Sequence, residues 1–271
     1  MKKTIYQGLI IILLFCVAWV SITKIDLVNL LKVEELTTET EEKIGNILFE
    51  LFKSSNQEIK DPFIVNTIDS IVSEICFKNG IHKKNIKLHI LKKDEINAFA
   101  LPNDHLIIYS GLIARAENQE ELIGVIGHEI AHIQLEHVMK KLINEFGLSM
   151  LISMTTNSGN GTEIIKETAK LLSSSSFSRK LEKEADMKAV NYLLTANIDP
   201  KPFANFLYKL SMENHTKTKY MSWINTHPES KERAEYIIQY IHEMNKENND
   251  YSQIISNQSW KELKQELFKL N

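Results

Sequence analysis

Cysteine is scarce in this sequence, and neither sign of charge is in excess. The two cysteines, Cys16 and Cys76, are too few for a disulfide framework. Lys and Arg number 32 against 35 Asp and Glu, so the formal net charge of −3 gives no electrostatic basis for nucleic-acid binding, and no nucleic-acid partner is expected. With 43% apolar and 25% charged residues, the 271-residue sequence predicts a globular domain rather than a disordered chain or a fibrous repeat.

One uncharged apolar run stands at the beginning of the sequence, over residues 5–23. As a helix it is about 28 Å long, close to the hydrocarbon thickness of a bilayer. It predicts a membrane anchor over residues 1–24, with a cleavable signal peptide as the alternative. Val20 stands where a signal peptidase needs a small residue, which favours the anchor. Lys2 and Lys3 ahead of the run indicate a cytoplasmic N-terminus, with the body of the protein outside the cytoplasm.

The chain behind residue 24 divides into three segments. Residues 25–60 carry apolar residues near helical spacing and predict a juxtamembrane helical segment, which packs on the domain or holds it off the membrane. Residues 61–245 are the predicted main domain. Residues 246–271 are polar until Trp260 and then amphipathic, so they predict a C-terminal tail.

Within the main domain, a short β-region precedes a long helical region. Apolar residues alternate over residues 86–91, and residues 98–101 and 105–109 flank a polar turn, which predicts a strand and a hairpin. The pattern then becomes helical, and its strongest stretch, residues 119–146, predicts one long helix. The predicted fold class is therefore α+β, predominantly helical, with a small sheet ahead of the long helix.

The long helix contains the motif His128-Glu129-Ile130-Ala131-His132. Residues four apart share one face of a helix, so both imidazoles project toward one point, and their neutral nitrogens suit a zinc ion, one per chain. Glu129 is angled away from the metal and can act as a general base on a water held there. Apolar flanks place the motif in the core, where such groups need partners, and this weighs against two ordinary surface histidines.

A third protein ligand has to come from another element. Glu182 and Asp186 are four apart on one predicted helix face, so a carboxylate ligand and an acceptor for a ligand imidazole can sit together. Glu184 lies about 200° around that helix from Glu182 and is expected to face away. A solvated charged face is the alternative for this stretch. His137, nine residues after His128, lies about 180° around a continuous helix, and we expect it to be structural.

Four stretches of the sequence stand in an order that resembles a known family. They read Asn97-Ala98-Phe99-Ala100-Leu101-Pro102 with Ser110-Gly111-Leu112; His128-Glu129-Ile130-Ala131-His132 with His137; Phe177-Ser178-Arg179 with Glu182-Lys183-Glu184-Ala185-Asp186; and Thr226-His227-Pro228-Glu229-Ser230 with Arg233. The chain resembles the gluzincin-like zinc metallopeptidases of the HtpX and CAAX-prenyl-protease type, and most of all their single-anchor bacterial or Oma-like branch. The resemblance covers about residues 63–241.

This resemblance implies a zincin-like metallopeptidase domain that cleaves peptide bonds of misfolded or membrane-associated proteins. By the match the third ligand is Glu182. The strand of Asn97, Ala98, Phe99 and Ala100 would align an extended substrate by main-chain pairing. The sequence departs from the family in lacking the several membrane helices of the prenyl proteases and space for a helical-repeat domain, so intramembrane CAAX processing and docking through repeats are not expected.

Two later residues have more than one possible role. His227 stabilises the oxyanion, or occupies the fourth position on zinc and keeps the enzyme latent, or is a plain histidine at a helix start before Pro228. Arg233 holds a carboxylate near the metal or only solvates its helix. The remaining histidines lack ligand-like spacing and are expected at the surface: His82, His89, His105, His215 and His242.

The predicted function is that of a zinc endopeptidase acting on envelope proteins. It would be held in the inner membrane by a single N-terminal span with its catalytic domain in the periplasm, or released into the periplasm after signal cleavage. Two other classes are open. One is a metal-bound but latent client-binding holdase or assembly factor with a capped site, and the other is a structural membrane tether without metal. The sequence indicates no particular oligomeric state.

Overall fold

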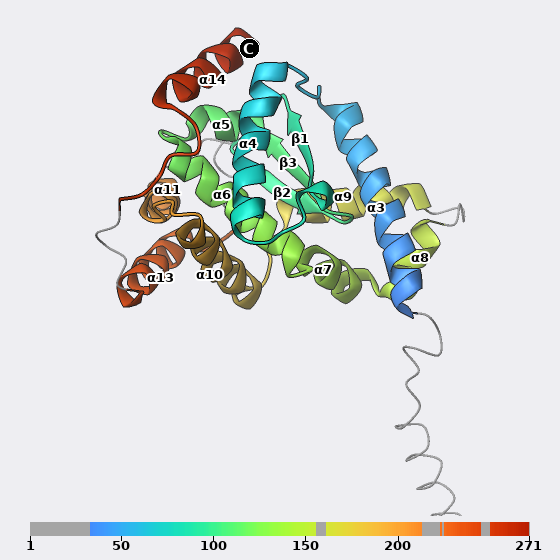
Figure 1. Cartoon of the computed structure of the whole chain (residues 1–271). Coiled ribbons are helices and arrows are strands. Elements are labelled where there is room, and N and C mark those ends of the chain that lie inside the picture. The colour runs from blue at the N-terminus through green and yellow to red at the C-terminus, as the bar shows by residue number, and fades with distance from the viewer. Residues whose placement is uncertain (1–32, 156–160, 213–222, 224, 245–249, 271) are drawn as a thin grey trace, which may run out of the picture. The chain divides into compact units, whose positions relative to one another are not determined.

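The computed structural model describes residues 33–155, 161–212, 223, 225–244 and 250–270 (Figure 1). The chain divides into two compact units, residues 1–41 and 42–271. Of the first unit only residues 33–41 are described, as the beginning of helix α3 (Val33–Ser55). The predicted anchor over residues 1–24 lies outside the described residues and stays a prediction. Among the helices that are described, none combines the length and the hydrophobicity needed to cross a bilayer.

The second unit contains a three-stranded sheet in the order β1-β3-β2 (Figure 1). Strands β1 (Lys87–Leu91) and β3 (His105–Tyr109) are parallel, while β2 (Ala98–Leu101) is antiparallel to β3, with Ala98 opposite Ile108. The predicted strand and hairpin are present, and the predicted fold class is confirmed. Strand β2 has β3 on one side only, and it packs on α6 and α9.

Helices make up most of the rest of this unit. Beyond α3 they are α4 (Pro62–Lys78), the 3-10 turn η1 (Lys83–Asn85), α5 (Ser110–Arg115), α6 (Gln119–Gln134), α7 (His137–Phe146), α8 (Leu148–Met154), α9 (Gly161–Ser174), α10 (Arg179–Thr195), α11 (Lys201–Met212), α13 (Ser230–Glu243) and α14 (Asn257–Leu270).

Helix α6 is enclosed by the other elements of the unit. It packs on β2, α4, α10 and α11 (Figure 1), and every residue from 121 to 133 is buried. Asn118 caps its N-terminus by accepting a hydrogen bond from the Glu121 N–H. Gly124 lets α11 approach closely, because a Cβ at this position would lie 2.3 Å from the Cβ of Phe203. The polar side chains between residues 121 and 133 are therefore shielded from solvent.

The predicted single helix over residues 119–146 is two helices in the structure. Helix α6 ends at Gln134 and α7 begins at His137, because Glu136 adopts a φ of 55° in the left-handed region. The chain changes direction there. The angle of about 180° between His128 and His137 around one continuous helix therefore does not describe the structure. The break turns His137 back toward the body of α6.

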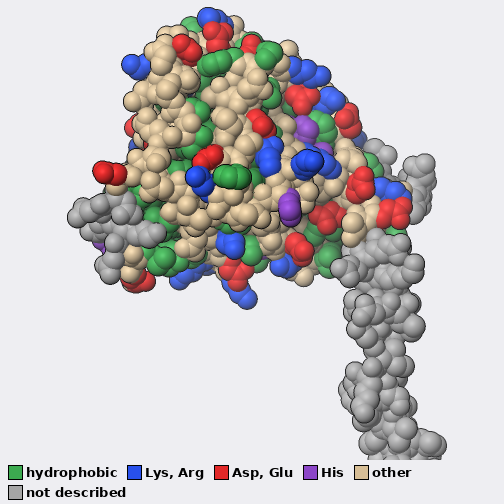
Figure 2. Space-filling model, viewed as in Figure 1, with side chains coloured by type: hydrophobic (Ala, Val, Ile, Leu, Met, Phe, Trp, Pro, Cys, Tyr) green, Lys and Arg blue, Asp and Glu red, His purple; other side chains and the backbone are tan. Residues whose placement is uncertain are grey.

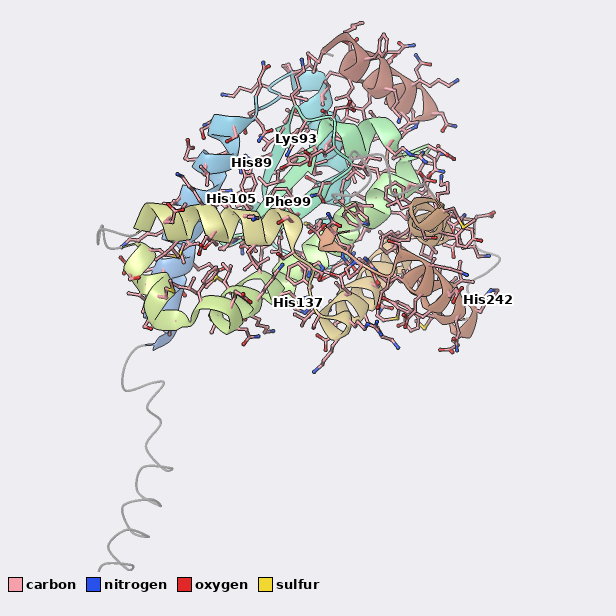
Figure 3. All side chains as sticks on the ribbon, turned by 180° about the vertical axis from the view of Figure 1, so that it is seen from behind. His89, Lys93, Phe99, His105, His137 and His242 are labelled. Carbon is pink, nitrogen blue, oxygen red and sulfur yellow. The ribbon has the colours of Figure 1, made fainter. Side chains whose placement is uncertain are left out.

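The latter part of α3 packs on the sheet through a pair of histidines. Phe49 stacks on His89 with 3.7 Å between ring centroids, and His89 Nε2 is 2.9 Å from His105 Nδ1. Figure 3 shows both histidines between α3 and the sheet. The prediction that His105 lies at the surface is wrong, since it is only 3% exposed, whereas the side chain of His89 is partly buried and 15% exposed. His215 lies outside the described residues.

The segment predicted as a C-terminal tail contains a packed helix. Helix α14 lies on α4 and α5 and buries Trp260, Leu263 and Leu267. Lys264 reaches from α14 to the C-terminal end of α5, where its ammonium donates to three main-chain carbonyls at 2.6–2.9 Å. The compact unit therefore extends past the boundary at residue 245 that the sequence pattern indicates.

The face shown in Figure 2 carries charged side chains of both signs. Lys and Arg side chains lie among Asp and Glu side chains, with hydrophobic side chains scattered between them. Ion pairs of this unit include Lys83 with Asp69 at 2.8 Å and Lys93 with Glu95 at 2.9 Å. The mixture agrees with the near-neutral net charge of the chain.

Candidate active site

Two helices and a turn bring four side chains together in the core. His128 and His132 come from α6, Glu182 from α10 and His227 from the turn ahead of α13. One nitrogen or oxygen atom from each lies within 4.8 Å of those of the other three, and all four residues are buried. His132 Nε2 is 3.0 Å from His128 Nε2, and His227 Nδ1 is 3.3 Å from His128 Nε2 and 3.1 Å from Glu182 Oε1.

This donor set fits a zinc ion. Imidazole nitrogens and a carboxylate oxygen are ligands that Zn²⁺ prefers, and four of them suit its tetrahedral geometry. Glu182 places its two oxygens 3.7 Å from His128 Nε2 and 3.5 Å from His132 Nε2. Burial lowers the pKa of His128 to about 3 and also lowers the pKa of His132 and of His227. Neutral imidazole, the form that burial favours, is the form that binds a metal.

Arg233 supplies a permanent positive charge behind the carboxylates. Its Nη1 is 2.8 Å from Glu182 Oε2, and its Nη2 and Nε donate to Asp186 Oδ1 and Oδ2 at 2.7 and 2.8 Å. Burial opposes ionisation of Glu182, but the His227 ring and Arg233 hold the pKa of its carboxyl well below the usual value. Burial also opposes ionisation of Asp186, and Arg233 with His128 lowers the pKa of that carboxyl. Both groups are therefore carboxylates.

Asp186 holds the ring of His128 from behind. Its Oδ1 is 2.9 Å from His128 Nδ1, while Nε2 of the same ring points into the cluster. The Tyr236 hydroxyl donates a hydrogen bond to the same carboxylate. Asp186 thus lies next to the imidazole of His128, and Arg233 contacts carboxylates, which is one of the two roles that the sequence leaves open for it.

Glu129 directs its carboxylate beside the cluster rather than into it. Its Oε1 is 3.3 Å from His227 Nε2, and its Oε2 accepts a hydrogen bond from the Ala100 N–H at 3.1 Å. Burial, followed by the charge of Glu182, raises the pKa of the Glu129 carboxyl well above its usual value, against the effect of the Ala100 N–H. A carboxylate in such surroundings takes up a proton readily, which is a property required of a general base.

The edge of β2 joins the site through Ala100. The Asn97 carbonyl accepts from the Tyr109 N–H at 3.0 Å, so the alternation of an antiparallel pair turns the main-chain groups of Asn97 and Phe99 toward β3. Those of Ala98 and Ala100 face the outer edge, where Ala100 meets Glu129. The four residues predicted to bind substrate therefore divide into two at the edge and two that face β3.

His137 lies beside this constellation, where its spacing on a continuous helix does not place it. Its Nδ1 is 3.0 Å from His132 Nδ1, and the residue is completely buried. Phe177 stacks on the other side of His132 at 4.2 Å between centroids. The expected position on the far side of the helix is wrong, because the break at Glu136 returns the chain to the site, whereas the structural role expected for His137 stays a prediction.

The model of peptidase family M48 matches residues 65–241, which is well over half of the chain. The chain belongs to peptidase family M48. This membership confirms the predicted resemblance and the prediction of a zinc metallopeptidase domain. The matched residues include the whole sheet and all of the residues placed above in the metal cluster and around it.

Three relatives that this M48 chain matches are longer than the chain itself. It is 29% identical over 175 residues to "Metalloendopeptidase OMA1, mitochondrial" of Bos taurus, which covers 60% of this chain and 34% of that protein. It is 24% identical over 204 residues to "Beta-barrel assembly-enhancing protease" of Yersinia pestis, and this alignment covers 71% of this chain and 42% of that protein. It is also 24% identical over 180 residues to "Mitochondrial metalloendopeptidase OMA1" of Schizosaccharomyces pombe, and this alignment covers 65% of this chain and 52% of that protein. The chain therefore spans between a third and about half of the length of these relatives.

Proposed function

We propose that this M48 domain is a zinc-dependent endopeptidase in which His128, His132 and Glu182 hold the metal and Glu129 is the general base. One observation carries the proposal. The Glu129 carboxylate stands beside the ligand cluster, with one oxygen directed to the site and the other fixed by the Ala100 main chain. A buried, oriented carboxylate next to a His-His-Glu donor set is suited to peptide hydrolysis.

The protein residues divide the reaction between them. Zinc, when bound, lowers the pKa of a water molecule and polarises the carbonyl of the scissile bond. Glu129 accepts a proton from the attacking water and then delivers it to the leaving amine. His227 Nε2, which lies 3.3 Å from Glu129 Oε1, is in a position to donate to the developing oxyanion. Asp186 and Arg233 hold His128 and Glu182 in place throughout.

Substrate would enter as an extended strand along the outer edge of β2. Ala98 and Ala100 offer main-chain groups there, and Ala100 is hydrogen-bonded to the proposed base. Pairing through the main chain places the scissile bond next to Glu129 without reading side chains. Loose sequence specificity follows, which suits an enzyme that removes misfolded proteins.

The proposed substrates are misfolded or membrane-associated proteins of the cell envelope. Two considerations support them. The apolar run over residues 5–23 has the length of a membrane anchor, and a relative is named for enhancing β-barrel assembly. The protein would then act as a single-pass inner-membrane enzyme on the periplasmic side, on protein substrates brought to it by the membrane.

A latent, client-binding protein is the second candidate, and the position of His227 favours it. His227 Nδ1 lies 3.3 Å or less from both His128 Nε2 and Glu182 Oε1, so it can complete the four donors around a metal. Substrate would then have no open position on zinc until this histidine moved. The intact Glu129 favours the peptidase, because a protein that only binds clients needs no general base.

Cleavage of an unfolded protein by the purified full chain tests the two candidates. Unmodified protein, Glu129→Gln and chelator-treated protein are compared at equal concentrations, with bound zinc measured in each. The peptidase is supported by cleavage that is lost in both controls while Glu129→Gln keeps its zinc. Zinc-bound protein that binds the unfolded substrate without cutting it would instead support the latent form. Cleavage that survives in Glu129→Gln would refute the role of the base.

A further inference from the structure

The two histidines of the proposed metal motif are supported from behind in different ways. Nδ1 of His128 meets the Asp186 carboxylate directly, at 2.9 Å. Nδ1 of His132 meets another imidazole, that of His137, at 3.0 Å. Only the first arrangement was expected from the spacing of the sequence motifs. The Glu182 carboxylate contacts the His132 ring only on its Nε2 side, so at Nδ1 the ring of His137 has to provide the acceptor.

The hydrogen-bond chemistry of an imidazole fixes the direction of this second contact. A histidine that binds a metal through Nε2 carries its proton on Nδ1. His132 must then donate from Nδ1, and His137 must accept at its own Nδ1. In that tautomer the proton of His137 is on Nε2, which lies 3.4 Å from Glu184 Oε2. The contacts His132–His137–Glu184 therefore run in one direction and end on a carboxylate, which His137 Nε2 meets as an ion-pair contact at 3.4 Å and not as an aligned hydrogen bond.

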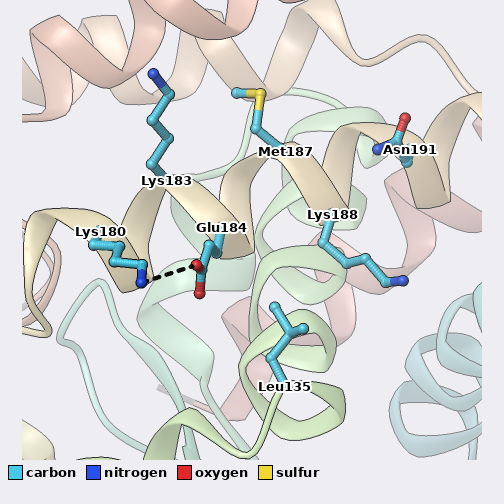
Figure 4. Close-up of a pocket in the computed structure, with 7 residues that line it drawn as sticks. All are labelled: Leu135, Lys180, Lys183, Glu184, Met187, Lys188 and Asn191. Carbon is cyan, nitrogen blue, oxygen red and sulfur yellow. Dashed lines mark ion pairs between the residues drawn. The ribbon is translucent and has the colours of Figure 1, made fainter.

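Glu184 is the outer end of this chain and lies at the surface. It lines an open cavity of about 530 Å³ on α10 (Figure 4), where its side chain is 46% exposed. Lys180 faces the second carboxylate oxygen, with Nζ 4.0 Å from Oε1. Glu184 does face away from the metal cluster, as expected, and it reaches the cluster only through the ring of His137. Figure 3 places His137 at the start of α7, within the domain.

We propose that His137 and Glu184 position His132, with His137 fixing the tautomer and orientation of the ligand ring and Glu184 fixing the tautomer of His137. The proposal rests on the proposed function, because it assigns His132 to the metal. His137 is a positioning residue and touches neither metal nor substrate. Phe177 limits rotation of the His132 ring by stacking on it at 4.2 Å, so the hydrogen bond has a single orientation to select.

Groups that orient metal-ligating histidines are worth roughly 10- to 100-fold in metal affinity. Replacing His137 by Phe keeps the ring and removes the acceptor, so the zinc affinity should fall at least tenfold. Asn at this position places its carbonyl oxygen close to where Nδ1 of the imidazole was, so His137→Asn should restore most of the affinity. Glu184→Ala should weaken zinc binding by a smaller factor, about threefold, because it acts through one more ring.

The experiment measures the zinc dissociation constant of the full-length protein by competition with a chromophoric chelator. The visible absorption of the Co²⁺ form is recorded in parallel. His132→Ala tests the metal site itself, and unchanged zinc affinity in this variant would refute the proposed function whatever His137 does. Lys183→Ala is the matched control, because Lys183 lines the same cavity as Glu184 and should leave the affinity unchanged.

With the metal site established, the His137 variants decide the proposal. Weaker zinc binding and an altered Co²⁺ band in His137→Phe, both restored in His137→Asn, support it. Wild-type affinity in His137→Phe overturns it, and so does equal weakening in the Phe and Asn variants. If His137→Phe does not fold, Glu184→Ala carries the test, since its exposed side chain can be removed without disturbing the core. Equal zinc affinities of Glu184→Ala and Lys183→Ala would then overturn the proposal.

Discussion

Arg233 and Asp186 form a bidentate pair in the core of the peptidase domain. The guanidinium donates from Nε to Oδ2 at 2.8 Å and from Nη2 to Oδ1 at 2.7 Å, and the two residues are 2% and 0% exposed. The same carboxylate contacts His128 Nδ1 at 2.9 Å. Helix α13 is thereby tied to α6 through α10, so the late sequence motif and the metal motif are parts of one structure.

Removing the guanidinium should strongly destabilise the domain. Arg233→Met leaves the carboxylates of Asp186 and Glu182 buried without their positive partner, and breaking such a pair costs about 3–5 kcal/mol. Urea unfolding of the metal-free protein measures this loss. The double variant Arg233→Met/Asp186→Asn should lose less free energy of unfolding than the two single variants lose together. The reason is that the double variant no longer buries the unpaired charge of Asp186. A loss below about 1 kcal/mol in Arg233→Met would contradict the structural account.

Local sequence signals predicted the hairpin and the histidine motif well. Alternation over residues 86–91 predicts β1, and two short segments on either side of a polar turn predict β2 and β3. Both signals depend on nearest neighbours, and the structure has all three strands. The convergence of His128 and His132 follows from the pitch of a helix. Spacing alone does not decide whether Glu182 is a metal ligand or part of a solvated charged face. It is 2% exposed and in the cluster because α10 packs on α6.

The break between α6 and α7 could not be predicted from the sequence. Left-handed backbone favours Gly or Asn, but the residue at the break is Glu136, with a φ of 55°. No local signal therefore separates His137 from the preceding helix. The burial of His105 could not be predicted for a related reason. It results from the packing of α3 on the sheet, where Phe49 stacks on the His105 ring, and the residues next to His105 in the sequence do not indicate this contact.

His227 should change the rate of peptide cleavage at least tenfold when it is replaced by Ala. If it stabilises the oxyanion, kcat/KM falls and zinc affinity is unaffected. If it occupies the fourth position on zinc, kcat/KM rises and the zinc dissociation constant rises with it. Measuring both quantities on one preparation separates the two roles. His242→Ala, on the exposed end of α13, is the control, and a rate for His227→Ala equal to that control would remove His227 from the site.

Gly124 should not tolerate a methyl group. Its Cβ would lie 2.3 Å from the Cβ of Phe203, which is close to the main chain and cannot swing away. Overpacking of this kind costs about 1–3 kcal/mol, against a gain of up to about 1 kcal/mol in helix propensity. Gly127→Ala on the same helix is the matched control, because its Cβ would meet the flexible end of the Leu193 side chain at 3.0 Å and Ala189 at an ordinary contact distance of 3.8 Å. Thermal unfolding should show a clearly lower midpoint for Gly124→Ala, and equal midpoints would contradict the close approach of α11.

His105 should make the stability of the domain depend on pH. Burial, followed by the neighbouring His89 and Lys87, lowers the pKa of His105 to about 3. The unfolded chain takes up this proton near pH 6.5. Between pH 3 and 6.5 the unfolded state therefore binds more protons than the folded state, so the free energy of unfolding rises with pH across this window. The groups around the ring are His89, Lys87 and Asn46, with Glu58 beyond His89.

Comparison with His105→Asn isolates this contribution, because the variant carries no titrating group at that position. Urea unfolding of both proteins at a series of pH values gives the two slopes. The wild-type slope should exceed that of the variant by about 1 kcal/mol per pH unit between pH 4 and 6, since one pKa unit corresponds to about 1.4 kcal/mol. The difference should vanish above pH 7.5, where His105 is neutral in both states. Parallel slopes below pH 6 would show that the His105 ring is protonated in the folded protein and would contradict its lowered pKa.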